Sequence, residues 1–446
     1  MAALDFETVF IPLVLAGVIA IIAFDLLDLA LAGLIGLSAL VVFDALRVQD
    51  LQSAMSNGGG SIALLFGGMV VARTLVPTGI FDIVGAVFLR ATKGDGRRFL
   101  IGLMILVAPL CAFLPNATIV VLLGPVVVSV CHRLEVDFIM PLILTAIISN
   151  TAGMLTLVGD PATFVIGTGI GLTFGGYLEK ISLGGLAALL AILPLLPLVG
   201  RDVWRRRIDL SDEIAIPRLE RPALALTALA VLALMIALFL FGDRLPHPMP
   251  PPAVAIVAAA LALLVLHGHR VETVEQVFRD IDWKTLVFLG CIFVMVEAVT
   301  RTGMLQGISR ALYDGFGKDL TLVGTAMLLL VGLLSCVLAN IPVAVAMTLV
   351  LKSYFVIAGL VPEEALASHY GAWPDLALPT FTAMMFGATL GGNATLIGAS
   401  ANIVGAGIAA AHGRPIGFGA FMKIGVPITV VQLLVGHLYA LASSRW

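Results

Sequence analysis

Charged residues are scarce in this chain. Asp, Glu, Lys and Arg make up only 12% of its 446 residues, about half of the roughly 25% that a soluble globular domain carries. Hydrophobic residues make up 60%, and uncharged runs such as 183–200 approach the roughly 17–25 residues that cross a bilayer as a helix. The alternating ten-residue segments typical of a membrane β-barrel do not appear. The composition therefore predicts an all-α polytopic membrane protein.

Signatures of catalytic and metal sites are also lacking. The four cysteines form no CxxC pair and fall in or beside apolar segments, where we expect small buried hydrophobic residues, with soft-metal ligation as the alternative (Cys111, Cys131, Cys291 and Cys336). The seven histidines are scattered, and HExxH, GxSxG and P-loop motifs are missing. We expect no metal, no cofactor, no nucleic-acid partner and no ATP hydrolysis by this chain, and a transporter rather than an enzyme.

The apolar runs are of two kinds. Uninterrupted runs predict membrane helices near 8–24, 29–46, 60–77, 182–200, 222–241, 251–267, 284–300 and 424–441. Four further regions carry Asn, Gly or Pro in their middle, and such breaks survive at membrane depth only where protein or a wet cavity satisfies the freed backbone groups. We interpret two of these regions as re-entrant hairpins (98–132 and 319–360) and two as broken helices (137–175 and 377–412).

The interrupted regions indicate an internal duplication. Asn340 follows Asn116 by 224 residues, as Thr302-Gly303 follows Thr78-Gly79, and Gly398 follows Gly159 by 239. Collinear matches over this length predict two repeats, 1–200 and 222–446, joined by the connector 201–221. Each repeat holds an odd number of crossings, five, so the second copy runs inverted. The predicted fold has about ten transmembrane helices.

Charge orients this arrangement. The connector 201–221 holds six arginines, which places it in the cytoplasm by the positive-inside rule. Alternation then places 48–59 in an outside loop, and both termini also outside. The segment 301–318 falls outside despite its basic residues, so we interpret it as an amphipathic interfacial helix. One hairpin is expected to enter from each side of the membrane.

The four breaks are expected to converge near the midplane and to build one central site. Half-helices that begin at the breaks aim backbone N–H groups and positive dipole ends at that point. The predicted substrate-binding residues are the neutral polar side chains at the breaks, namely Asn116, Thr118, Asn150, Thr151, Thr156, Asn340, Asn393, Thr395, Ser400 and Asn402. Glycines that permit close backbone approach flank them, namely Gly153, Gly159, Gly391, Gly392 and Gly398.

Asp160 is the one acid within a break. A charge at that depth costs at least about 2.5–3.5 kcal/mol. It is either a coupling residue for protons or cations, or the N-cap of a helix that starts at Pro161, and the two roles are compatible. Arg73 and Glu297 occupy equivalent repeat positions near helix ends, where we expect their charged groups to reach the interface.

Two segments carry a family resemblance. "SNTAGMLTLVGDPATFVIG" (149–167) and "GGNATLIGASANIVGAGIAAAHGRPIGFGAFMKIGVP" (391–427) resemble the signature segments of the ArsB / NhaD / P-protein permeases of the ion transporter superfamily. The resemblance implies a scaffold that holds a moving transport domain made of the hairpins and broken helices. It also implies a site at the matching Asn116, Asn150, Asn340 and Asn393, and an integral protein of a prokaryotic plasma membrane.

The predicted substrate follows from one position at which this chain differs from the family pattern. Sodium-type members typically carry an acid before the hairpin asparagine, where this chain has Pro115. The remaining neutral groups suit arsenite or antimonite, since arsenite is an uncharged trihydroxy acid that needs amide and hydroxyl partners. The sequence therefore favours proton-coupled arsenite efflux, with an NhaD-type Na⁺/H⁺ antiporter or an exporter of another oxyacid (silicic acid, carboxylate) as alternatives. Such permeases can work with a separate soluble ATPase, and a homodimer is compatible with the sequence.

Overall fold

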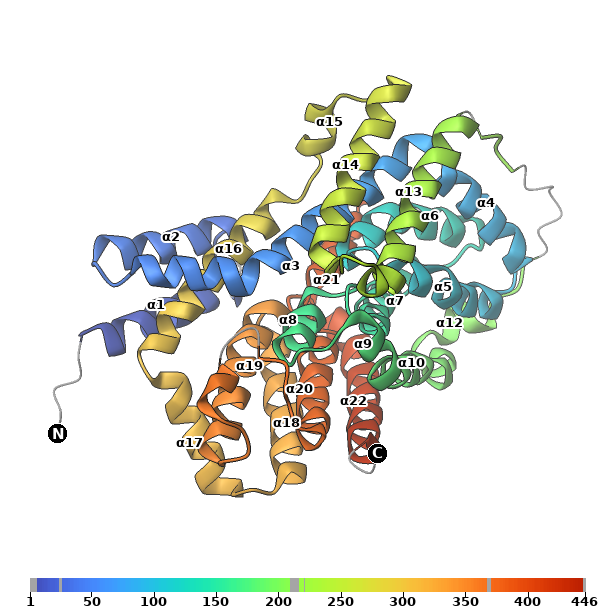
Figure 1. The fold of residues 1–446 in the computed structure, drawn as a ribbon. Helices are drawn as coiled ribbons and strands as arrows, with labels where there is room; N and C mark the ends of the chain where they lie inside the picture. Colours follow the sequence, from blue (N-terminus) through green and yellow to red (C-terminus); the bar gives the residue numbers. More distant parts are fainter. Residues whose placement is uncertain (1–5, 24–25, 209–215, 220, 367–369, 444–446) are drawn as a thin grey trace.

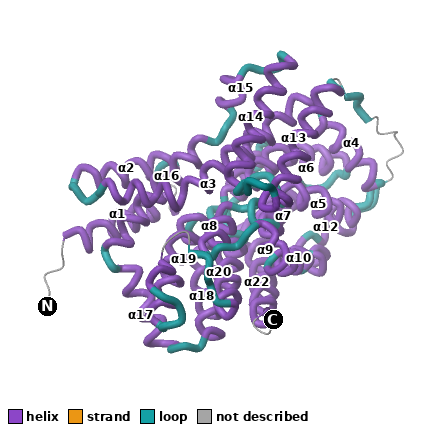
Figure 2. The backbone as a smooth tube through the Cα atoms, in the orientation of Figure 1, coloured by secondary structure: helices purple, strands orange, loops and turns teal. Residues whose placement is uncertain are grey.

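The computed structural model describes residues 6–23, 26–208, 216–219, 221–366 and 370–443. Within these residues the chain is built from helices and loops, without a strand (Figure 2). The first repeat and the start of the connector contain α1 (Phe6–Ala23), α2 (Leu29–Val42), α3 (Val48–Leu75), α4 (Ile80–Thr92), α5 (Gly96–Cys111), α6 (Asn116–Arg133), α7 (Ile139–Ala152), α8 (Pro161–Gly169), α9 (Phe174–Lys180), α10 (Ser182–Leu190), α11 (Leu196–Val199) and α12 (Arg201–Arg205).

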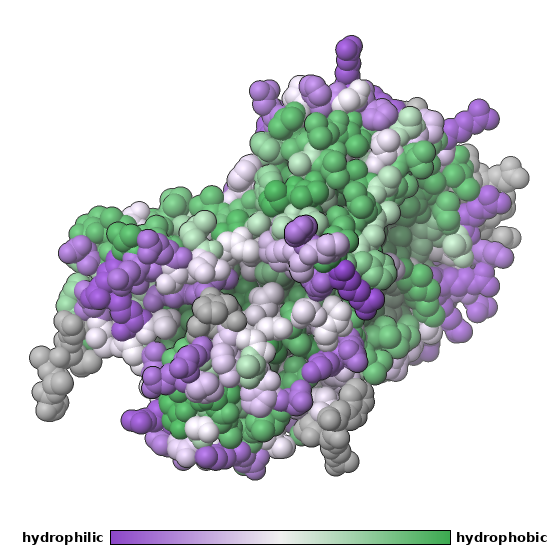
Figure 3. Space-filling model, viewed as in Figure 1, coloured by the Kyte–Doolittle hydropathy of each residue, from purple (hydrophilic) through white to green (hydrophobic). Residues whose placement is uncertain are grey.

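The second repeat contains α13 (Pro222–Phe241), α14 (Pro251–His269), α15 (Val274–Arg279), α16 (Trp283–Arg301), α17 (Met304–Phe316), α18 (Leu320–Val337), α19 (Asn340–Ile357), α20 (Leu378–Gly391), α21 (Ser400–Ala411) and α22 (Phe418–Ser443). Nine spans among the described residues are long and apolar enough to cross a membrane, beside shorter apolar helices. Figure 3 shows broad apolar areas over α13 and α14, as a lipid-facing surface requires. The predicted all-α membrane fold is confirmed.

The duplication is visible in the helix boundaries. α19 begins and ends 224 residues after α6, and α17 begins and ends 224 residues after α4. α20 begins and ends 239 residues after α7. In Figure 1 the α5–α6 and α18–α19 hairpins approach the centre of the molecule from different sides. Both hairpins and both broken helices are therefore present as predicted, and 301–318 does contain an amphipathic helix, α17.

One helix prediction needs correction. The segment 48–59, expected as an outside loop, is the first part of α3. Alternation of the crossings placed it in a loop, but the backbone N–H of Arg47 donates to the Asp50 carboxylate at 2.9 Å and caps the helix. At 28 residues, α3 is about 42 Å long, at 1.5 Å per residue.

The predicted span 182–200 is present as Ser182–Val199, in which α10, a 3-10 turn and α11 follow one another. Pro194 and Pro197 interrupt it, because a proline has no N–H for the helix ladder and clashes with the preceding turn.

Two groups of helices frame the centre. α3 and α16 pack against each other and against α2 and α14, with α1 and α13 outside them. The hairpins and broken helices form the other group, in which α18 packs on α20, and α6 packs on α7 and α21. A crevice between the groups is bounded by α3 and α16 on one wall and by α8 and α19 on the other. The connector 201–221 lies partly outside the described residues.

Candidate functional site

Four helix N-termini meet at a central cavity of about 100 Å³. The cavity is lined by the starts of α6, α8, α19 and α21, so residues from both hairpin tips and both broken helices share one space. The lining polar residues are Asn116, Asn150, Asp160, Asn340 and Ser400, with Asp282 and Thr285 from α16. A helix N-terminus presents unpaired N–H groups and a partial positive charge, so the backbone around this cavity favours oxygen atoms of a ligand.

Matching hydrogen bonds fix the hairpin tips against the broken helices. The Thr156 hydroxyl donates to the carbonyl of Ala112, and the Thr395 hydroxyl donates to the carbonyl of Cys336. The donors are 239 residues apart and the acceptors 224, so each repeat makes the same contact. These two threonines, expected to bind substrate, are used to hold the breaks in place.

The glycines of the breaks allow two backbone segments to touch. A Cβ atom on Gly159 would lie 2.6 Å from the carbonyl oxygen of Gly153, and one on Gly398 would lie 2.5 Å from the carbonyl oxygen of Gly392. Real Cβ atoms do not approach backbone this closely, so neither position accepts a side chain without moving the chain. A Cβ on Gly391 would lie 2.3 Å from the Gly332 carbonyl oxygen, which brings α20 against α18.

A buried amide network joins the two repeats behind the cavity. The Asn150 amide donates to the side-chain oxygens of Asn393 at 3.1 Å and Asn402 at 3.0 Å. Asn393 in turn donates to Thr151 at 3.1 Å and to Gln432 at 3.0 Å. Asn402 donates to the carbonyls of Gly392 and Thr395, both at 2.8 Å. The network satisfies these side chains internally, as buried polar groups require.

Gln432 was not among the predicted site residues. It lies in α22, is fully buried, and donates to Thr151 at 2.9 Å and to the Ala188 carbonyl at 3.2 Å. A glutamine within a long apolar helix was the available signal, because such a residue needs a partner in the membrane. The sequence could not identify that partner, which is contributed by the other repeat.

The two hairpin asparagines differ in their partners. One orientation of the Asn340 amide gives both its nitrogen and its oxygen suitable neighbours. In that orientation the nitrogen donates to the Gly398 carbonyl and to the Ser335 hydroxyl, each at 2.8 Å. The Asn116 side-chain oxygen is buried and has no hydrogen-bond partner. The residue equivalent to Ser335, 224 positions earlier, is Cys111, which is a weak hydrogen-bond donor.

Asp160 caps α8 and also faces the cavity. Its Oδ1 accepts from the Ala162 N–H at 2.8 Å, which confirms the predicted N-cap. The residue is 3% exposed and lines the cavity. The equivalent position in the second repeat, 239 residues later, is Ala399. The acid is therefore present in one half of the site only.

The structure divides the predicted binding residues. Five of the eleven predicted binding and coupling residues line the central cavity, as given above. The other six do not line it; they are Thr118, Thr151, Thr156, Asn393, Thr395 and Asn402. All six except Thr118 are buried, with the hydrogen bonds just described. A role of any of these residues in binding stays a prediction.

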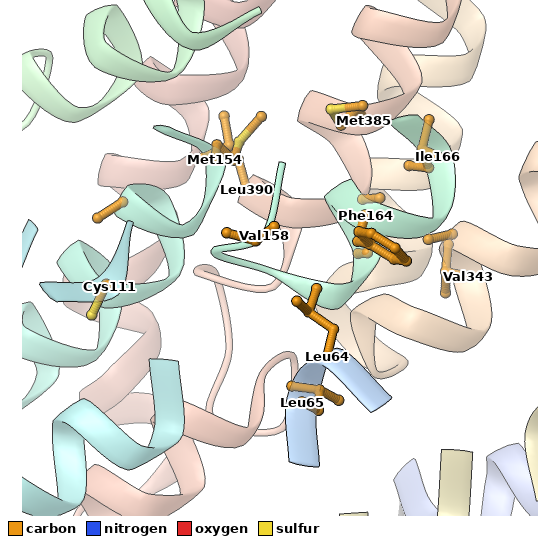
Figure 4. Close-up of a cluster of buried hydrophobic side chains, with 14 of the residues drawn as sticks. Leu64, Leu65, Cys111, Met154, Val158, Phe164, Ile166, Val343, Met385 and Leu390 are labelled. Atoms are coloured by element: carbon orange, nitrogen blue, oxygen red, sulfur yellow. The ribbon is translucent and has the colours of Figure 1, made fainter. Parts of the chain in front are cut away.

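A second, larger cavity follows the first along the crevice. This vestibule, of about 370 Å³, is lined by later turns of α8 and α19, by an earlier turn of α3 and by a later turn of α16. Along the chain, Leu64 and Val343 each lie between a residue that lines the central cavity and one that lines the vestibule. Phe164 lines the vestibule. Figure 4 shows these three apolar side chains near the start of α8.

Comparisons with known proteins agree with this architecture. The family model described as "Citrate transporter" (CitMHS) matches residues 19–371. An uncharacterized transporter of Synechocystis is 39% identical over 96% of this chain and 95% of its own. The human P protein is 27% identical over 96% of this chain and 59% of its own.

A solved structure shares the fold. The YdaH transporter of Alcanivorax borkumensis, whose title reports an unusual topology, superposes with a TM-score of 0.56 at 12% identity, over 88% of this chain and 87% of that one. The likeness to an ArsB-type permease in particular finds no support in these matches. The relatives are bacterial as well as human, and the bacterial transporters place the chain in the plasma membrane. The chain belongs to the citrate transporter (CitMHS) family of membrane transporters.

Proposed function

We propose that this protein is a secondary transporter that exports a small oxyacid, arsenite or antimonite, in exchange for protons. The observation that supports this function is the composition of the central cavity. Its lining combines asparagine amides and four helix N-termini of the hairpins and broken helices with the carboxyl groups of Asp160 and Asp282, and it contains no Lys or Arg among the described residues. Such a lining suits a solute that both donates and accepts hydrogen bonds.

A trihydroxy acid can use each of these groups. Its hydroxyl groups donate to the Asn116 oxygen, which lacks a partner within the protein, and accept from the N-termini of α6 and α8. The volume of about 100 Å³ holds several water-sized groups. A solute of four heavy atoms fits this space.

Asp160 provides the proton site. Protonated, it donates a hydrogen bond into the cavity, and ionised, it accepts one, so its charge state changes what the cavity binds. Exchange follows if the hairpins and broken helices move as one body against α3 and α16, which turns the cavity from one side of the membrane to the other. Without substrate, the moving helices then return to the first orientation only when Asp160 is protonated.

A carboxylate is the second candidate, because one observation favours it. Four helix N-termini at one point stabilise a negative charge without any basic side chain. The description of the matching family model names citrate. Sodium is less favoured, since the breaks contribute one carboxylate, and the second acid of the lining, Asp282, already accepts from the N–H and hydroxyl of Thr285.

Transport into everted membrane vesicles tests this proposal. With an imposed proton gradient, the wild type should accumulate arsenite, and Asp160→Asn should bind arsenite but lose gradient-driven accumulation, because asparagine keeps the N-cap and cannot titrate. Asp375→Asn is the control, since that carboxylate is 94% exposed. Citrate or sodium movement without arsenite accumulation in the wild type would contradict arsenite as the substrate.

A further inference from the structure

Basic side chains gather where the connector meets the first hairpin. The segments 90–98, 131–135 and 201–207 contain nine Lys and Arg residues but only three Asp and Glu residues, and we call these nine residues the basic cluster. Eight of the nine are exposed. Figure 3 shows hydrophilic side chains along the edge of the molecule where Figure 1 places α4, α5 and α12. The surface there carries a net positive charge.

Backbone contacts hold the connector against the turn between α4 and α5. The Gly96 N–H donates to the Arg206 carbonyl, and the Ile208 N–H donates to the Gly94 carbonyl, both at 2.9 Å. A Cβ on Gly96 would lie 1.8 Å from the Val203 carbonyl oxygen, so the start of α5 touches the connector backbone directly. The arginines of this part of the connector are therefore fixed beside those at the start of α5.

Ion pairs within the protein neutralise only part of the cluster. Arg206 pairs with Glu135, and Arg207 pairs with Asp95. Within the part of the chain that the structure describes, no other member of the cluster forms an ion pair. Arg97 lies 5.5 Å from the centre of the Trp204 ring, a cation–π contact that leaves its charge in place. Like charges this close repel one another, so a counter-charge from outside the chain is favourable here.

The second repeat shows that the hairpin fold does not require these charges. α5 and α18 begin 224 residues apart, and in each the preceding aspartate caps the helix by accepting from two backbone N–H groups. The residues of α18 that correspond to Arg97 and Arg98 are Thr321 and Leu322. The same turn therefore forms without basic side chains, and the basic cluster is a property of one repeat only.

An apolar strip continues the cluster along α5. Ile101 and Ile105 follow Arg97 at steps of four residues, which places the three side chains on one face of the helix. Ile101 is 37% exposed and Ile105 is 70% exposed. A phospholipid presents the matching order of groups, a polar headgroup followed by hydrocarbon. An acidic soluble protein would match the basic cluster but not the apolar strip.

We propose that the basic cluster binds the headgroup of an anionic phospholipid, whose acyl chains lie along Ile101 and Ile105. The lipid phosphate accepts hydrogen bonds from guanidinium groups, whose planar fork suits a phosphate. Several Lys and Arg residues directly beside a membrane helix are typical of such sites. The positive-inside rule assigns the lipid to the cytoplasmic leaflet. The site does not depend on the cargo of the central cavity.

Titration of the purified full-length protein in detergent with two lipids tests this site. The lipids are phosphatidylglycerol, which is anionic, and phosphatidylcholine, whose headgroup adds a positive charge to the same phosphate. Microscale thermophoresis measures both affinities. We expect phosphatidylglycerol to bind at least about tenfold more tightly, and the difference to shrink as salt screens the charges. Equal affinity for the two lipids would overturn the proposal.

Variants assign the affinity to the cluster. Arg98→Gln and Arg205→Gln should each weaken phosphatidylglycerol binding about fivefold, and together about 25-fold, because each basic residue near an anionic surface contributes separately. Arg98→Lys keeps the charge and should retain most of the affinity. Lys423→Gln is the control, since this lysine is exposed and lies outside the cluster. Size exclusion shows whether each variant is folded.

Three results would contradict the proposal. If Lys423→Gln weakens binding as much as the cluster variants do, the affinity comes from net charge alone. If the cluster variants bind phosphatidylglycerol like the wild type and change only the orientation of the protein in the membrane, the charges serve topology. If soluble polyglutamate binds more tightly than phosphatidylglycerol, the cluster is a docking surface for an acidic protein. Arsenite transport, measured in parallel, tests the central cavity separately.

Discussion

The two halves of the central site have the same backbone and different chemistry. In the second half, the hairpin asparagine Asn340 has hydrogen-bond partners within its own repeat. The helix after the break, α21, has Ala399 at its N-cap position. In the first half, the Asn116 side-chain oxygen has no hydrogen-bond partner. The helix after the break, α8, has Asp160 at its N-cap position. Duplication preserved the geometry of the breaks, because glycine contacts and threonine bonds define it. The side chains that can act on a solute are concentrated in one copy.

The largest expected effect comes from the amide network that joins the halves. Asn393→Met introduces the residue that the first repeat has 239 positions earlier, Met154. It removes one hydrogen-bond partner each from Asn150, Thr151 and Gln432 in a buried site, and the Gln432 side-chain oxygen loses the only one it has among the described residues. Each buried group left unpaired costs about 1–3 kcal/mol, so we expect loss of most folded protein. Fluorescence-detected size exclusion measures this, and Met154→Leu, a volume-conserving change, is the control.

Alanine substitution of the two hairpin asparagines should separate binding from stability. Asn116→Ala should lower substrate affinity roughly 5- to 150-fold, the equivalent of about 1–3 kcal/mol, with little change in thermal stability, since Asn116 makes no hydrogen bond within the protein. Asn340→Ala should lower thermal stability, because Gly398 and Ser335 lose their partner. Equal effects of the two variants on affinity and on stability would show that the half-sites are equivalent.

The threonine bonds at the tips should be equivalent in the two copies. Thr156→Val and Thr395→Val each remove one bond from a broken helix to a hairpin tip. Each should lower the free energy of unfolding by about 0.5–1.5 kcal/mol, and by similar amounts. Denaturant unfolding in detergent measures both. A large cost in only one repeat would argue that the breaks are not held alike.

The smallest expected effect comes from replacing one thiol sulfur with a hydroxyl oxygen. Cys111→Ser gives the first repeat the hydroxyl that the second repeat has at Ser335. If that hydroxyl donates to the Asn116 side-chain oxygen, it occupies a group that the solute would otherwise use and lowers substrate affinity a few-fold. Binding titration measures the change, with Cys131→Ser as the control. Tighter binding in Cys111→Ser would contradict the idea that the unpartnered oxygen receives the substrate.

Much of the fold follows directly from the sequence. Hairpins were predicted over 98–132 and 319–360, and the structure turns between Cys111 and Asn116 and between Val337 and Asn340. The N-cap role of Asp160 also follows from its position before Pro161. The helical start of α3 does not, because a polar, glycine-rich segment is typical of a loop and becomes helical here by capping and packing against α14 and α16.

The sequence by itself determined the class of molecule, the duplication and the positions of its breaks, because hydropathy, glycine and proline act locally along the chain. Only the tertiary structure decided which polar residues face the cavity and which satisfy one another. Asn393 and Asn402 look like binding residues in the sequence, but their partners, Asn150, Thr151 and Gln432, come from distant helices. A buried polar side chain bonds to whatever group folding brings within about 3 Å, and that choice is made between helices rather than within them.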